Sequence, residues 1–291
     1  MTTPGSAVPP IDTAAWAAGL ERDRAATTAG FADGLRSPYA AVARHDFQGD
    51  KTMTFGNAAG CDAQLEGLAP RHLQIRVEGD HFRVAALDAE ATFRLLGAGP
   101  GSPLRESQVA PGAKVEAGRY VLRLSHQNFP AALVLDPKSP QLAAGKPPVW
   151  FPPDLGFRTL ARLVADAQPR QEVVQSTRGN KRRALRLGTL EFSLTGQALS
   201  LVALRLLEPG TGEAAVSVFF RDDTTGHESY PVGRYLDPVP VEGAPGTYLL
   251  DFNRAYNPSC AFSPLFNCPI PPRENRLAVA VRAGERDPGN H

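Results

Sequence analysis

The chain has 291 residues, of which 42% are hydrophobic and 21% charged, and its formal net charge is +1. This composition is typical of a folded protein and excludes general disorder. Because the charges nearly balance, the sequence lacks the electrostatic basis for nonspecific nucleic-acid binding. No stretch approaches the roughly 20 apolar residues that span a bilayer, and the N-terminus shows no signal segment. We therefore expect a cytoplasmic protein with neither nucleic-acid nor membrane partners.

Residues 1–50 are predicted to form an N-terminal helical segment. Asp12 or Thr13 is suited to cap a helix, since its side-chain oxygen can accept a bond from an orphan backbone N–H. Trp16 and Leu20 are four residues apart and share one helix face. We expect this face to pack on a β core.

Residues 51–136 read as short β runs separated by Gly, Asp or Pro, which predicts a small sandwich. The segment MTFGNAAGCDAQLEGLAPRHLQIRVEGDHFRVAAL resembles the front half of a forkhead-associated (FHA) domain. The resemblance rests on a strand that ends in Gly56, on the pair Cys61-Asp62, and on Arg71-His72 before an alternating strand. It implies a module that docks a phosphopeptide or another protein partner.

This resemblance departs from the pattern of a working FHA module at the phosphate-binding positions. Such a module has an Arg directly after the Gly and a Ser or Thr shortly before the His. Here Asn57 follows Gly56, and Ala69-Pro70 precede Arg71. A phosphate would lose its bidentate partner and its hydroxyl donor. We therefore favour a β module retained for packing or docking.

Residues 137–291 are predicted to form a larger antiparallel β-barrel-like domain. The clearest signal is a hairpin in which Gly196 separates two runs with one apolar face. Leu277–Val281 is expected to be the last strand, tied by Asn275 and Arg276 to the loop at Asn253–Asn257. The alternating apolar residues of the hairpin are Leu190, Phe192, Leu194, Leu199, Leu201 and Ala203.

From about Trp150 the chain resembles an uncharacterised bacterial family, domain of unknown function 1684 (DUF1684). The matching segments are WFPPDLGFR, GTLEFSLTG, VFFRDDTTGHESYPVGRYL and LDFNRAYNPSCAFSPLFNCPIPPRENRLAVAVRAGE. The resemblance implies a shared fold in which these segments form a common surface. It implies no reaction.

Polar and aromatic residues follow several of the predicted strands of this domain. If the turns meet at one mouth of a barrel, Arg side chains surround Asp side chains there and can bind a small polar or anionic ligand. An internal ion-pair network that holds the loops is an equally good interpretation. The candidate ligand-binding residues are Arg221, Asp222, Tyr230, Arg234, Tyr235, Asp251, Asn253, Arg254, Tyr256, Asn257, Asn275 and Arg276.

Cys260 and Cys268 are the two cysteines of the C-terminal segment. Their spacing differs from the tight pairs of zinc ribbons, so we predict no metal, with a site made by both cysteines as the alternative. Two reduced buried thiols are the leading expectation, and a disulfide is sterically possible. The sequence shows neither a nucleophile elbow nor a phosphate-binding Gly loop, and we predict no cofactor.

Three functional hypotheses follow. The first is a ligand-binding protein with its site at the barrel mouth. The second is a hydrolase-type enzyme that uses a carboxylate such as Asp251, or the thiolate of Cys260, at the same mouth; its catalytic residues are unknown. The third is an interaction scaffold that docks a protein partner through residues 51–136.

Overall fold

The computed structural model describes residues 12–47, 51–97, 101–207 and 215–289. The N-terminal residues 1–11, on which the expectation of no signal segment rests, lie outside these ranges. The protein is mainly β with an N-terminal helix, as predicted. The chain divides into two compact units. The described residues of the large unit are 12–30, 146–207 and 215–289, and those of the sandwich unit lie within 31–145.

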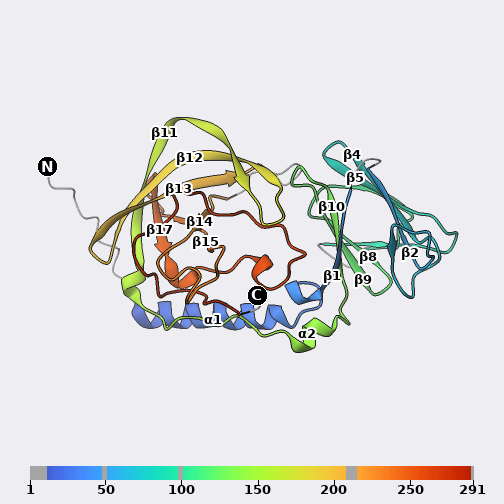
Figure 1. Cartoon of the computed structure of the whole chain (residues 1–291), viewed down its shortest axis with the longest axis horizontal. Helices are drawn as coiled ribbons and strands as arrows, with labels where there is room; N and C mark the ends of the chain where they lie inside the picture. Colours follow the sequence, from blue (N-terminus) through green and yellow to red (C-terminus); the bar gives the residue numbers. More distant parts are fainter. Residues whose placement is uncertain (1–11, 48–50, 98–100, 208–214, 290–291) are drawn as a thin grey trace. The chain divides into compact units, whose positions relative to one another are not determined.

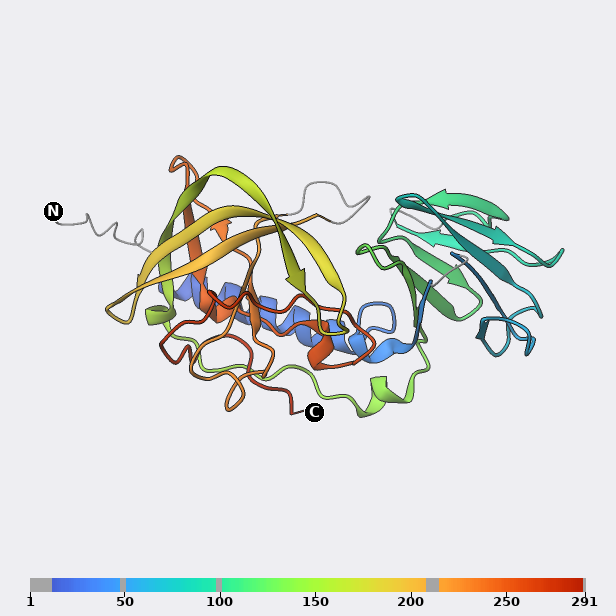
Figure 2. The same cartoon turned by 45° about the horizontal axis from the view of Figure 1, so that its top comes forward.

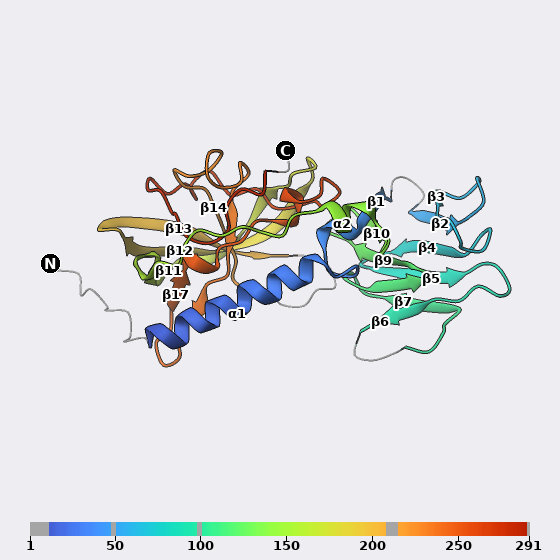
Figure 3. The ribbon, with the colours of Figure 1, turned by 90° about the horizontal axis from the view of Figure 1, so that it is seen from below.

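The N-terminal helix α1 (Thr13–Phe31) is the long helix of the large unit, seen clearly in Figure 3. The carboxylate of Asp12 accepts bonds from the backbone N–H groups of Ala14 and Ala15, both at 3.0 Å, and so caps the helix as predicted. Leu20 is buried on the face it shares with Trp16. No helix in the described ranges is both long and apolar enough to cross a bilayer.

The sandwich unit consists of two five-stranded sheets around one apolar core. The first sheet has the order β1-β10-β9-β8-β6, and the second the order β3-β2-β4-β5-β7. Short helical turns η1 (Pro38–Ala40) and α2 (Pro140–Ala144) flank the strands. The strands are β1 (Ala41–Asp46), β2 (Thr52–Gly56), β3 (Ala63–Gln64), β4 (Leu73–Glu78), β5 (His81–Ala86), β6 (Arg94–Leu96), β7 (Glu106–Val109), β8 (Lys114–Ala117), β9 (Tyr120–Ser125) and β10 (Ala131–Leu135).

The large unit is built on a five-stranded antiparallel sheet of order β13-β12-β11-β17-β16. Its long strands arch over the two-stranded ribbon β14-β15 and the C-terminal coil (Figures 1 and 2). The sheet is open among the described residues, with β13 and β16 at its edges, so it does not close into a barrel. The elements are η2 (Leu155–Phe157), β11 (Arg158–Gln175), β12 (Lys181–Leu194), β13 (Gln197–Leu206), β14 (Val218–Phe220), β15 (Arg234–Leu236), β16 (Val239–Pro240), β17 (Thr247–Asp251), η3 (Phe252–Arg254) and η4 (Ser259–Ala261).

The predicted hairpin is confirmed in β12 and β13. Leu194 pairs with Gln197 across a two-residue turn. Thr195 and Gly196 both have positive φ, 50° and 79°, which is the backbone that a tight hairpin of this kind requires. Leu190 and Leu201 are opposite one another and fully buried. The alternating apolar residues therefore supply one wall of the core of the large unit.

The expected final strand at Leu277–Val281 is wrong. This segment is coil, and Arg276 makes one isolated bridge to Arg221. Its backbone bonds are divided between the loop after β14 and two buried side chains. The N–H of Leu277 donates to the carbonyl of Arg221 at 2.8 Å, and the carbonyl of Val279 accepts from the N–H of Asp223 at 3.0 Å. The N–H of Val281 donates to Asp222 at 2.7 Å, and the carbonyl of Val281 accepts from Arg234 at 2.8 Å. Buried backbone groups need partners, and at Val281 an ion pair provides them.

Candidate functional site

The candidate site residues fall into three groups in the large unit. One group surrounds the ion pair of Asp222 and Arg234, a second surrounds Glu285, and a third surrounds the thiols of Cys260 and Cys268. The three groups differ in exposure and in chemistry.

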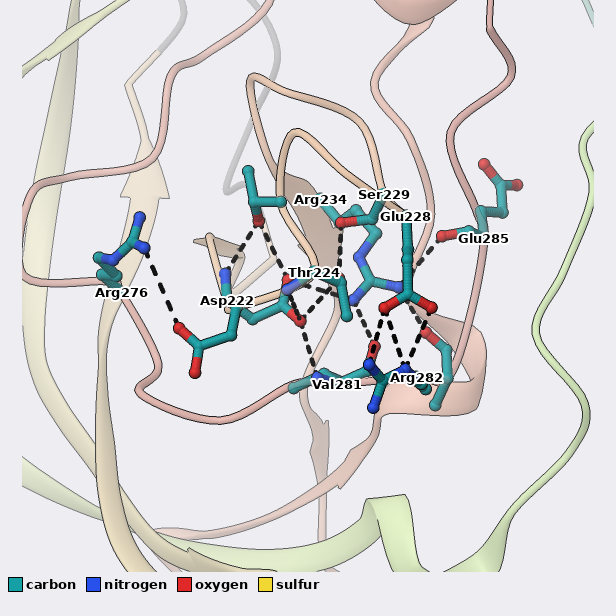
Figure 4. A network of polar contacts seen from close by, with 12 residues as sticks. Asp222, Thr224, Glu228, Ser229, Arg234, Arg276, Val281, Arg282 and Glu285 are labelled. Carbon is teal, nitrogen blue, oxygen red and sulfur yellow. Dashed lines mark hydrogen bonds and ion pairs between the residues drawn. The ribbon is translucent and has the colours of Figure 1, made fainter.

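Asp222 and Arg234 form a buried ion pair at 3.4 Å, and both side chains are about 1% exposed or less (Figure 4). The Arg234 guanidinium also donates to the carbonyls of Val281, Ala283 and Glu285. Its flat faces lie near the rings of Phe220 and Phe151. Burial lowers the pKa of Arg234. These contacts tie β15 to the C-terminal coil.

Asp222 also organises the loop that follows β14. It accepts from the hydroxyl of Thr224 at 2.8 Å and from that of Thr225 at 3.0 Å. The Thr224 hydroxyl in turn contacts the hydroxyl of Ser229 at 2.8 Å. Asp222 therefore joins the β14 loop, β15 and the C-terminal coil at one point, a structural role for two of the predicted ligand-binding residues.

Two further predicted residues of this region differ in their exposure. Arg276 is 64% exposed in its side chain and lies 4.0 Å from Asp223. Arg221 is half-buried and donates through Nε to the carbonyl of Val232 at 3.0 Å. Arg276 is thus exposed to solvent, whereas the ion pair of Asp222 and Arg234 is buried.

The side chain of Asn275 is fully buried and binds backbone groups of two strands. Its Nδ2 donates to the carbonyls of Val202 and Phe219 at 3.1 and 2.8 Å, and its Oδ1 accepts from the N–H of Val202 at 2.7 Å. Asn275 therefore joins β13 to β14. The expected tie to the loop at Asn253–Asn257 is wrong, because the amide is used at these strands.

The second group, here called the Glu285 cluster, consists of Arg24, Trp150, Phe151, Arg234, Asn257 and Glu285. The N–H of Asn257 donates to the Glu285 carboxyl at 2.8 Å. Arg24 donates to the carbonyl of Phe151 at 3.1 Å, and its guanidinium lies 5.6 Å from the Trp150 ring centre. Helix α1, the segment after residue 149 and the C-terminal coil thus bring distant parts of the sequence together.

Asp251, Asn253 and Arg254 lie beside this cluster. Asp251 accepts from the indole N–H of Trp16 at 2.8 Å and from Asn253 Nδ2 at 3.0 Å. Asn253 also exchanges two bonds with the backbone of Asp154. Arg254, whose side chain is 41% exposed, pairs with Asp251 at 3.6 Å and with Asp23 of α1. These contacts hold α1 against the end of β17.

The electrostatics of the Glu285 cluster are unusual for a carboxyl group. Burial raises the pKa of Glu285 to about 7, against the smaller opposing effects of the Asn257 N–H and of the Arg234 and Arg24 charges. Burial also lowers the pKa of Arg24, although Asp251 and Glu285 oppose this shift. A carboxyl that titrates near neutral pH can both give and take a proton there.

The Glu285 cluster also gathers buried polar atoms that lack hydrogen-bond partners. Among the atoms of the described residues, Nε of Arg24, Nε of Arg234 and Oδ1 of Asn257 are buried and make no hydrogen bond. Two of these atoms are donors and one is an acceptor. Such groups cost free energy unless a partner satisfies them, so their concentration beside one carboxyl marks a polar site.

The third group, here called the thiol cluster, consists of Tyr230, Cys260, Cys268 and Thr177. Cys260 packs against the small apolar cluster that contains Cys268, and the two thiols are close enough for each to shift the pKa of the other. The Tyr230 hydroxyl is 3.7 Å from Cys260 Sγ, and the N–H of Cys268 donates to the Thr177 hydroxyl at 3.1 Å. Both cysteines are free thiols. Cys260 is half-buried and Cys268 is buried.

The other two tyrosines among the candidate residues, Tyr235 and Tyr256, border the thiol cluster. Tyr235 is buried, and its hydroxyl donates to the carbonyl of Pro269 at 2.6 Å. The Tyr256 ring packs edge-on against that of Tyr235, and its hydroxyl contacts Asp237 at 3.3 Å. In the parts of the chain that the structure describes, no group of three or more His, Cys, Asp and Glu side chains could hold a metal ion.

The FHA-like phosphate positions in the sandwich unit are occupied by local contacts. The N–H of Asn57 donates to the carbonyl of Ala69 at 3.0 Å, and the carbonyl of Asn57 accepts from Gln64. The N–H of Arg71 donates to Asp88 at 3.0 Å. Asn57 and Arg71 therefore lie at loops that the residues around them hold in place.

Four residues of the Glu285 cluster are absent from the residues predicted for the site: Arg24, Trp150, Phe151 and Glu285. One signal for Arg24 was present: Trp16, Leu20 and Arg24 are spaced four apart and share one face of α1. The raised pKa of Glu285 has no local signature, because it results from burial by segments far away in the sequence.

Comparisons with known proteins found one family model and several similar solved structures. A family model described as protein of unknown function (DUF1684) matches residues 149–286. An uncharacterised protein of Haloarcula marismortui, solved by solution NMR, is 37% identical, with 51% of this chain and 80% of that chain covered and a TM-score of 0.41. No curated protein matches.

Solved FHA domains are also among the similar structures. The FHA domain of FhaA, solved in complex with the intracellular domain of Rv3910, is 20% identical and covers 30% of this chain and 82% of that chain, with a TM-score of 0.22. A structure from a study of phosphothreonine-dependent FHA domain interactions is 21% identical, with 30% and 79% covered and a TM-score of 0.22. The family model and the 37% identity to the archaeal protein together show that the chain belongs to the DUF1684 family.

Proposed function

We propose that the protein binds a small polar ligand that carries an anionic group, and that the Glu285 cluster is where it binds. The observation that carries this proposal is the concentration of unpartnered polar atoms on Arg24, Arg234 and Asn257 around a buried carboxyl. Among the predicted residues, Arg234 and Asn257 belong to the cluster directly, and Asp251, Asn253 and Arg254 lie beside it.

The chemistry of the cluster indicates the class of ligand. The guanidinium of Arg24 suits an anionic group, because Arg presents its N–H donors in a planar fork. The Oδ1 atom of Asn257 needs a donor such as a hydroxyl. Trp150 is half-buried beside Arg24 and offers an aromatic face. A small hydroxy acid or sugar phosphate carries all of these complementary features.

The test compares ligand-induced thermal stabilisation of the wild-type protein with that of Arg24→Met. Glycolate, malate, citrate and glycerol phosphate are the probes. A ligand that binds only the native state stabilises it by about 2.7 kcal/mol at a concentration of 100 Kd. We expect at least one probe to raise the Tm of the wild type in a saturable manner, and Arg24→Met to remove this effect. Arg162→Met, which changes an exposed arginine of β11, is the matched control and keeps the wild-type response.

Two results would count against this function. One is a set of Tm values that no probe changes. The other is an equal response from the wild type and Arg24→Met, which would mean that the anion binds elsewhere. Arg276→Met then tests the exposed arginine beside Asp223 as the alternative position. Native mass spectrometry of freshly purified protein supplements the test, since a bound ligand gives a mass excess that denaturation removes.

A second candidate function, acid–base catalysis on the bound ligand, is favoured by the burial of the Glu285 carboxyl, since this residue is 4% exposed. The pKa of Glu285 is raised to about 7 by burial, which suits a group that transfers protons at neutral pH. Glu285→Gln is expected to retain the thermal response to a probe but to lose its chemical conversion, followed by mass spectrometry of the small molecule. Conversion that persists in this variant would exclude Glu285 as the acid or base.

A further inference from the structure

We infer that Cys260 and Cys268 form a thiol–disulfide exchange site, in which Cys260 attacks a small external disulfide and Cys268 completes the exchange. This site is separate from the proposed ligand-binding function. The inference rests on the direct contact of two thiols with unequal exposure, in a segment that the neighbouring hairpin holds in place.

The two cysteines differ in the way that such exchange requires. Cys260 lies in the short turn η4 and is half-buried, so it is the more exposed of the two cysteines. Cys268 is buried, with 8% of its surface exposed, and contacts the Cys260 thiol from within. The first thiol is therefore positioned to attack, and the second to resolve the mixed disulfide.

Hydrogen bonds also favour the thiolate at Cys260 over that at Cys268. Cys268 and then Tyr230 and Thr177 bond to Cys260 and lower its pKa to about 7, against the effect of burial. The pKa of Cys268 is raised, first by its bond to Cys260 and then by burial. Because the thiolate is the nucleophile, Cys260 is the reactive thiol at neutral pH.

The backbone around Cys268 is fixed by the tip of the β11–β12 hairpin. The N–H of Thr177 donates to the carbonyl of Cys268 at 2.9 Å, and the Thr177 hydroxyl accepts from the N–H of Cys268 at 3.1 Å. Arg178 donates to the carbonyl of Pro264 at 3.2 Å, within the loop that joins the two cysteines. The thiols thus face each other without a rearrangement of the strands.

The exchange has two steps. The Cys260 thiolate attacks one sulfur of an external disulfide RS–SR, a new S–S bond to Cys260 forms, and RS⁻ leaves and takes up a proton. Cys268 then loses its proton, its sulfur attacks Cys260 Sγ, and the second RS⁻ leaves with that proton. The protein loses two electrons in forming its disulfide, and the external disulfide gains them in becoming two thiols.

The test uses the full chain and glutathione as the external thiol and disulfide. Protein equilibrated at different ratios of reduced to oxidised glutathione is quenched with iodoacetamide, and its mass is measured. Of the three cysteines, two are expected to become protected together, while Cys61 remains alkylated. The fraction of oxidised protein should depend on the square of the reduced glutathione concentration divided by the concentration of glutathione disulfide. Protection of neither thiol in glutathione disulfide alone would overturn the inference.

Variants separate the two roles and keep the test informative. Cys268→Ser is expected to accumulate a mixed disulfide of Cys260 with one glutathione, whereas Cys260→Ser should react with iodoacetamide at Cys268 at least tenfold more slowly than the wild type does at Cys260. Cys61→Ala is the matched control, since this half-buried thiol donates to a backbone carbonyl at 3.2 Å, and it should leave the paired oxidation unchanged. Equal reactivity of Cys260→Ser and wild type would contradict the assigned order.

Discussion

At the scale of single residues, the buried Asp222 joins several segments of the large unit. Its carboxylate pairs with Arg234 and accepts from two threonine hydroxyls and from the backbone of Val281. Removing one partner of a buried ion pair leaves the other charge uncompensated, which costs about 3–5 kcal/mol. The loss includes the desolvated guanidinium of Arg234, which has 1% exposure.

We therefore predict that Asp222→Ala lowers the free energy of unfolding by about 3–5 kcal/mol. Urea unfolding followed by circular dichroism measures this loss. Asp223→Ala is the matched control, because its side chain is 50% exposed and pairs with Arg276 only at 4.0 Å. Asp223→Ala should leave the urea concentration at the midpoint of unfolding almost unchanged. Similar losses from both substitutions would show that the buried ion pair is not what holds the C-terminal coil.

Glu285 provides a prediction of how stability depends on pH. Its pKa in the folded protein is raised by burial to about 7 from an ordinary value of 4.5. Between these values the folded state binds the proton more tightly than the unfolded state. Its stabilising contribution is therefore complete below pH 4.5 and is lost as the pH rises through 7. A pKa difference of this size corresponds to a change in the free energy of unfolding on the order of 3 kcal/mol.

We predict that Glu285→Gln removes this dependence and is more stable than the wild type at pH 8. The measurement is the difference in unfolding free energy between the two proteins from pH 5 to pH 8, which isolates Glu285 from other titrating groups. The exposed Glu191→Gln serves as the control. A difference that stays constant with pH would mean that Glu285 titrates at its ordinary value.

At the scale of elements, local patterns were predictable and side-chain partners across the fold were not. The β12–β13 hairpin follows from the alternation of apolar residues and from Thr195-Gly196 at the turn, all within one short stretch. The cap at Asp12 is equally local. By contrast, Leu277–Val281 has the residues of a strand, but its backbone bonds are divided between the loop after β14 and the side chains of Asp222 and Arg234. No pattern within that segment reveals these distant partners.

The sequence could indicate only part of the candidate site. The polar residues after strands β14 and β17 do gather in the large unit, but Asp222, Arg234 and Asn275 are used to hold backbone segments. Arg24 comes from a helix more than two hundred residues earlier than Glu285. The approach of Arg24 to Glu285 depends on the docking of α1. The spacing of Trp16, Leu20 and Arg24 indicates that they share one helix face, but it does not indicate which segment that face contacts.

The C-terminal coil supports a prediction at Gly284, the residue before Glu285. Its φ is 76°, and a Cβ there would lie 2.5 Å from the carbonyl oxygen of Ala255. Gly284→Ala therefore combines backbone strain with a clash against backbone that cannot move cheaply. Gly243 has a similar φ of 72° with nothing within 4 Å of its Cβ position. We expect Gly243→Ala to cost about 1 kcal/mol of unfolding free energy and Gly284→Ala about 3 kcal/mol. Equal losses would show that the coil moves away from Ala255 freely.

At the scale of the whole molecule, each compact unit has apolar cores of its own. The buried residues packed around Phe82 all belong to the sandwich unit, and those packed around Phe252 all belong to the large unit. A unit with its own core can unfold as a cooperative element. The two units are therefore expected to respond separately to changes in their cores.

Calorimetry of the full chain tests this separation with two matched core substitutions. Phe82 and Phe252 are both fully buried, and replacing a buried Phe by Ala costs about 3–5 kcal/mol. In units of these sizes such a loss lowers the Tm by roughly 6 °C or more. We predict that Phe82→Ala lowers the Tm of the sandwich unit alone, while Phe252→Ala lowers that of the large unit alone. A single transition that both substitutions shift together would mean that the units unfold as one cooperative structure, in spite of their separate cores.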